Sequence, residues 1–142
     1  MDRQTGSWSA GPLRFETAYR FIGGDQGPSV RITAEETHGA APAGKQLIRH
    51  DCFQDYPHSH YFHADGSGGD RELRQGADAA ASVQATLQEL REELPDVLRR
   101  IGYPELATAL AEHSAAVATV LDGVAEQLTA GVSQDGSGTG EA

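Results

Sequence analysis

The sequence predicts an α+β fold in which an antiparallel β-meander of about four strands precedes a C-terminal helical hairpin. Two patterns along the 142-residue chain support this order. In the N-terminal part apolar residues alternate with polar ones, which is the period of a half-buried strand. Beyond Ala81 they recur every three or four residues, which is the period of an amphipathic helix. The length is typical of one domain, here residues 1–142.

Four segments in residues 10–63 have the pattern of strands, and turn-forming residues separate them. The alternation is clearest in residues 13–21, where Leu13, Phe15 and Tyr19 fall on one face. Glycines and a proline in residues 23–28 predict a turn. The further strands are predicted at residues 29–35, 46–53 and 58–63. Residues 1–9 are polar, and we expect them to be frayed.

The second half of the chain predicts helices. Residues 64–81 are rich in glycine and aspartate and predict a linker, and helices are expected in residues 82–131. Gly102 suits the end of one helix and Pro104 the start of a last, long one, so the two helices fold back as a hairpin. Glu89 is expected on a solvated helix face. Residues 132–142 predict a disordered tail. The apolar stripe of the last helix predicts a homodimer contact.

Composition restricts the classes of partner. The chain has 21 acidic and 11 basic residues, a formal net charge of −10. This charge argues against binding to nucleic acid or anionic membranes, although Arg14, Arg20, Arg31 and Arg49 can share a surface. A single cysteine forms no internal disulfide, and no signal peptide or membrane span is visible. We therefore expect a soluble cytoplasmic protein, and the single lysine, Lys45, is typical of a GC-rich bacterial genome.

Residues 50–63 hold four of the six histidines and the only cysteine. If a hairpin pairs Cys52 with His58, then His50 lies opposite His60 and these side chains share one face. Imidazole and thiolate are ligands that zinc, copper(I), nickel and iron accept. This register predicts a site for zinc or another transition metal, with Cys52, His58, His60 and His50 as ligands and the Asp51 carboxylate as a further one.

A register shifted by one residue predicts a different site from the same segment. His58 and His60 then face Arg49 and Asp51, which is closer to an anion-binding or acid–base arrangement. Cys52 would instead pack into the core on the opposite face, as lone cysteines on strands usually do. A hydrogen-bonded packing face without any ligand is the third interpretation of these residues.

Residues 49–53 read RHDCF and residues 57–61 read PHSHY, and these two motifs resemble an uncharacterised family of short prokaryotic proteins. The shared core of that family reads Arg-aromatic-Asp-Cys-Phe, a short gap, and Pro-His-Tyr-His-Tyr. The resemblance covers about residues 15–103 and implies a common fold and no known activity. The chain departs from the pattern at His50 and Ser59. The pattern therefore supports Asp51, Cys52 and the two later histidines as site residues, but not His50.

Three functions fit these observations. The first is a small binding or accessory protein that holds a transition metal on the predicted hairpin. The second is a small enzyme in which His58, His60 and Asp51 perform acid–base chemistry. The third is a structural or protein-interaction module that meets a protein partner through its C-terminal helices.

Overall fold

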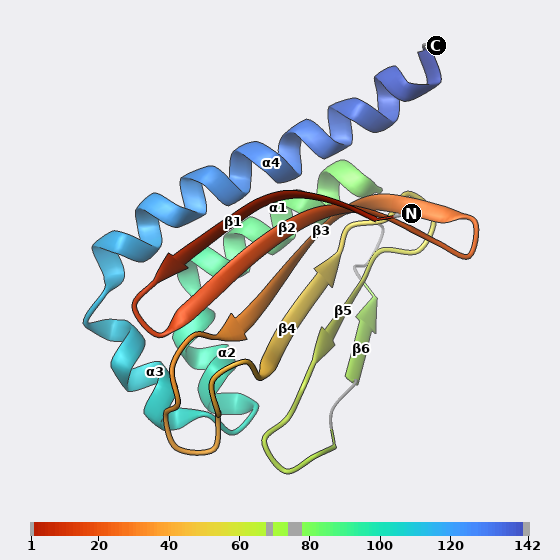
Figure 1. The fold of residues 1–142 in the computed structure, drawn as a ribbon. Helices are drawn as coiled ribbons and strands as arrows, with labels where there is room; N and C mark the ends of the chain where they lie inside the picture. Colours follow the sequence, from red (N-terminus) through yellow and green to blue (C-terminus); the bar gives the residue numbers. More distant parts are fainter. Residues whose placement is uncertain (1, 68–69, 74–77, 141–142) are drawn as a thin grey trace.

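The computed structural model describes residues 2–67, 70–73 and 78–140. Within them an antiparallel sheet precedes the helices, which confirms the predicted α+β fold (Figure 1). The sheet is a meander whose strands pair in chain order. Its strands are β1 (Arg3–Ala10), β2 (Leu13–Ile22), β3 (Asp25–Ala34), β4 (Gln46–Asp51), β5 (His58–Tyr61) and β6 (Asp70–Leu73). The helices are α1 (Ala79–Glu92), α2 (Leu94–Arg100), α3 (Pro104–Ala111) and α4 (Ser114–Gly140).

Two edge strands lie where the sequence predicted none. The predicted frayed start forms β1, in which Trp8 lies opposite Phe15 of β2 and packs against the core. Part of the predicted linker forms β6, which pairs with β5. Both segments lack a regular apolar alternation. They are strands because a neighbouring strand offers its free backbone groups, and pairing satisfies donors and acceptors on both sides.

The hairpin between β2 and β3 is tighter than predicted. Ile22 pairs with Asp25, which leaves only Gly23 and Gly24 as the turn. Their φ angles are +56° and +87°, and positive φ at both central residues is what a type I′ turn requires. The chain therefore enters β3 at residue 25, several residues before the predicted start.

The helices begin and end differently from the prediction. The predicted last helix is divided into α3 and α4 at His113, whose ring lies against Gly11 in the turn between β1 and β2. Asp78 caps α1 by accepting a hydrogen bond from the Ala81 amide at 2.8 Å. Where a disordered tail was predicted from Val132, α4 instead continues to Gly140. Val132 packs against the core, so the first residue of the predicted tail is part of the folded domain.

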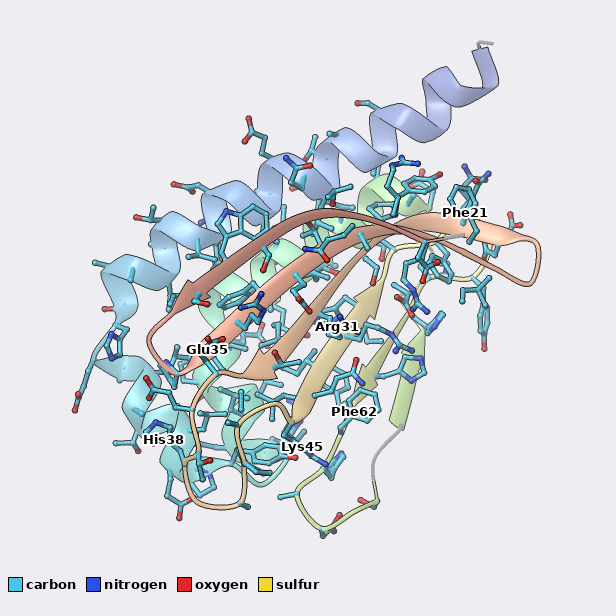
Figure 2. All side chains as sticks on the ribbon, viewed as in Figure 1. Phe21, Arg31, Glu35, His38, Lys45 and Phe62 are labelled. Carbon is cyan, nitrogen blue, oxygen red and sulfur yellow. The ribbon has the colours of Figure 1, made fainter. Side chains whose placement is uncertain are left out.

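All four helices lie on one side of the sheet (Figure 1). Buried apolar side chains from the strands and the helices form the core between them. Phe15, Ile32 and Ile48 point from the strands into this layer, where Leu90 and Leu121 meet them from the helices. The other face of the sheet is open and polar. Figure 2 shows Arg31 on that open face. No helix in the described part of the chain has the length and apolar character needed to cross a membrane.

Candidate metal site on the open face of the sheet

The register between β4 and β5 decides which side chains meet. Asp51 pairs with His58, Arg49 with His60 and Ile48 with Tyr61. The predicted pairing of Cys52 with His58 is therefore wrong, and the register shifted by one residue is the one the structure has. The physical reason is the core, because this register turns Tyr61 rather than Phe62 toward the helices beside Ile48.

Two of the five predicted metal ligands consequently lie on the helix side of the sheet. Cys52 is fully buried, with its Sγ 3.5 Å from Oγ1 of Thr86 in α1. His50 is also fully buried, and its Nε2 lies 3.0 Å from Oε2 of Glu89. The expectation that they share a surface with His58 and His60 is wrong. Strand alternation sends neighbours to opposite faces, so the sheet separates them from the open face.

The three remaining predicted residues, Asp51, His58 and His60, meet on the open face. Their ligand atoms, one carboxylate oxygen and one nitrogen from each ring, all lie within 4.8 Å of one another. Asp51 and His58 are buried and His60 is half-buried. Among the described residues this is the one group of histidine, cysteine and acidic side chains with such spacing.

Asp51 is the centre of the cluster and is only 1% exposed. Its Oδ1 accepts from Oγ of Ser29 at 2.7 Å and Nη1 of Arg20 at 3.2 Å. Its Oδ2 lies 3.2 Å from Nε of Arg49 and 3.1 Å from Nε2 of His58. Burial alone would raise the pKa of the carboxyl group. Hydrogen bonds from His58 and Ser29 and the charges of Arg49 and Arg20 outweigh it and hold the pKa well below its usual range.

The imidazole of His58 is fixed through both ring nitrogens. Nδ1 lies 2.8 Å from the backbone carbonyl oxygen of Tyr56, and Nε2 faces Asp51. The His60 ring stands edge-on to it, with the centroids 4.9 Å apart, and stacks on Phe62 with the centroids 6.0 Å apart. A rigid buried imidazole and a more accessible one therefore sit beside the same carboxylate.

The helix side of the hairpin holds a second polar network. His50 Nδ1 lies 2.6 Å from Oγ of Ser59, and Tyr61 donates to Oε1 of Glu89 at 2.8 Å. The Glu89 side chain is 12% exposed rather than solvated as predicted, because α1 packs this part of its surface on β4 and β5. This network connects the sheet to α1 and lies on the face opposite the candidate site.

Sequence reasoning missed two neighbours of the cluster, Ser29 and Arg20. They come from β3 and β2, more than 20 residues before Asp51 in the chain, so no local motif joins them to it. The only signal was the expectation that Arg14, Arg20, Arg31 and Arg49 can share a surface. Arg20 and Arg49 of that group do meet, at Asp51.

Comparison with known proteins identifies a family. A family model described as Domain of unknown function (DUF7700) matches residues 7–128, which confirms the resemblance to an uncharacterised family and extends it at both ends. No curated protein and no solved structure matches the chain. The matched residues include all of the open-face cluster.

Proposed function

The chain belongs to this family of unknown function, and from the geometry of the open face we propose that it binds a divalent transition metal ion, with zinc the first choice. The ligands are Oδ2 of Asp51, Nε2 of His58 and one imidazole nitrogen of His60. The observation that carries the proposal is that one ligand atom from each of these three side chains lies within 4.8 Å of the other two. Nitrogen and oxygen donors of this kind suit zinc, nickel and iron(II).

The cluster needs little rearrangement to close around an ion. Zinc lies about 2.0–2.2 Å from nitrogen and oxygen ligands, so tetrahedral ligands are about 3.3 Å apart. Asp51 and His58 already meet at 3.1 Å. His60 is the most accessible of the three ligands, because its ring is half-buried while Asp51 and His58 are buried, so the adjustment around an ion falls mainly on this side chain. Three protein ligands leave further coordination positions for water or a bound molecule.

The surroundings orient two of the ligands before a metal arrives. A metal-binding histidine usually donates its other ring N–H to a carbonyl or carboxylate, and Nδ1 of His58 lies beside the Tyr56 carbonyl oxygen in this way. Ser29 and Arg20 hold Oδ1 of Asp51, which aims Oδ2 at His58. A bound metal would replace the direct contact between Nε2 of His58 and Oδ2 of Asp51.

The charges at the site point to a modest affinity. Arg20 and Arg49 lie 3.2 Å from the Asp51 carboxylate and repel a divalent cation. Their presence favours a reversible accessory role over a structural metal that is needed for folding. An acid–base enzyme is less well supported, because both nitrogens of His58 already face oxygen atoms and the ring is only 7% exposed.

The test is zinc titration of untagged, metal-free protein by calorimetry, with cobalt(II) absorption as a second readout. His60→Gln removes the most accessible ligand, and His38→Gln is a matched control because that imidazole pairs with Glu36 in a different loop. We expect wild type and the control to bind one equivalent of zinc, and His60→Gln to bind at least about tenfold more weakly. Equal affinity in all three proteins, or no binding in wild type, overturns the proposal.

A further inference from the structure

A polar depression lies on the open face of the sheet beside the Asp51 cluster. Its volume is about 300 Å³, and Arg20, Arg31 and Arg49 line it together with Ser29. We propose that this depression binds a small molecule through an oxyanion group, a phosphate or a carboxylate. The proposal does not depend on the metal, because the arginines that form the depression are present in the metal-free protein.

The three arginines come from three adjacent strands. Arg31 of β3 lies directly opposite Arg49 of β4, and both side chains are on the open face. Like charges in opposed positions of a sheet destabilise it unless other charges compensate them. Arg31 turns toward Glu16, at 2.8 Å, and Arg49 turns in the other direction toward Asp51. An anion placed between them would compensate the repulsion that remains.

The guanidinium groups still have hydrogen-bond donors to offer. A guanidinium has five N–H donors. Among the described residues Arg49 has a hydrogen-bond partner only at Nε, and neither Nη1 nor Nη2 has one. Nη2 of Arg20 and Nη1 of Arg31 also have no hydrogen-bond partner among the residues that the structure describes. Planar pairs of N–H groups are the donors that recognise phosphate and carboxylate.

The charge of the lining agrees with an anionic ligand. Three arginines and two acidic residues, Asp2 and Glu16, line the depression, and the Asp51 carboxylate lies beside it, so the local charge is balanced in a chain whose net charge is −10. The Arg20 and Arg49 side chains are 19% and 24% exposed. Their charges are therefore partly shielded from water, which strengthens their attraction for an anion over that of fully exposed arginines.

The size of the depression limits the ligand. A volume of about 300 Å³ is at the lower end of the range for small-molecule sites. It suits one compact molecule with a charged group at the arginines. A nucleic-acid backbone would need a long basic stripe, which the lining does not provide.

The experiment is calorimetric titration of metal-free protein at low salt, with inorganic phosphate in one arm and acetate in the other. Arg31→Gln is the first variant, because its hydrogen-bond partner among the described residues is Glu16 alone. Arg49→Gln is the second. Arg14→Gln is the matched control. Arg14 lies on the same face of β2 as Glu16 and pairs with it, but it does not line the depression.

We expect saturable binding of at least one anion by wild type and by Arg14→Gln with equal affinity. Each of the two variants in the depression should bind about tenfold more weakly or worse. The arm that binds identifies phosphate or carboxylate as the preferred group. No saturable binding of either anion at millimolar concentration overturns the proposal, as does an equal loss in the Arg14→Gln control. Neither result bears on zinc binding, which is measured separately.

Discussion

Replacing Asp51 by asparagine tests how the open face of the sheet is held together. The substitution keeps the shape of the side chain and its ability to accept a hydrogen bond from Ser29. It removes the negative charge that Arg20, Arg49 and His58 surround. We expect the folded state to lose stability because three donors then face a neutral amide. The loss of stability should be greatest in the part of the sheet where β2, β3, β4 and β5 contribute side chains to the Asp51 cluster.

The size of this loss in the free energy of unfolding follows from the burial and the charge of Asp51. Removing one partner of a buried ion pair costs about 3–5 kcal/mol. The arginines at Asp51 are 19% and 24% exposed, so solvent screens part of their charge. We therefore expect a loss of about 2–3 kcal/mol in the free energy of unfolding at pH 7.

The pH dependence has a definite sign. The pKa of Asp51 in the folded protein lies below its ordinary value of 3.8, because the hydrogen bonds and arginine charges outweigh the effect of burial. A group with a lowered folded-state pKa contributes its full stability above the unfolded pKa. That contribution falls as the pH drops below about 4 toward the folded-state pKa. The difference between wild type and Asp51→Asn should therefore be largest at neutral pH and shrink below pH 4.

Urea unfolding followed by circular dichroism, from pH 7 down to pH 3, measures both effects. Asp55→Asn is the control, because Asp55 is exposed in the loop between β4 and β5. It should change the free energy of unfolding by no more than about 0.5 kcal/mol. A variant at Asp51 that is as stable as wild type at pH 7 would refute the reasoning. So would a deficit that stays constant as the pH falls.

Two further substitutions test the packing around the hairpin. A Cβ added at Gly27 would lie 2.3 Å from the backbone carbonyl oxygen of Cys52, so Gly27→Ala should lower the free energy of unfolding by about 1–3 kcal/mol in a urea titration. An unchanged urea midpoint would show that β3 and the end of β4 can move apart with little loss in the free energy of unfolding. His50→Phe removes the hydrogen bonds to Ser59 and Glu89 and should cost about 1–3 kcal/mol by the same measurement. A more stable variant would mean that this buried network opposes folding.

Local periodicity alone was sufficient to predict that the strands precede the helices along the chain. Strand alternation around Phe15 and Ile32, and the helical spacing of Leu87, Leu90 and Leu94, both appear in the core as expected. These patterns are readable because each element has to bury one face of its own. The same reasoning identified the segment that contains the candidate site, since its histidines are close together in the chain.

The edge strands and the helix ends required the folded structure. The strand β1 is polar along most of its length and pairs because β2 is beside it. The division between α3 and α4 at His113 depends on a contact with the distant Gly11. Neither feature has a local signal, since each is decided by a partner that is far away in sequence.

The identity of the site residues also depended on tertiary structure. The sequence alone left two registers for the hairpin, one with Cys52 beside His58 and one with Asp51 there. Packing against the core and α1 selects the second register, because Tyr61, His50 and Cys52 are buried on the helix side of the sheet. A shift of one residue exchanges the two faces of a strand. Only a packed core can determine that shift, because it requires one particular face to be apolar.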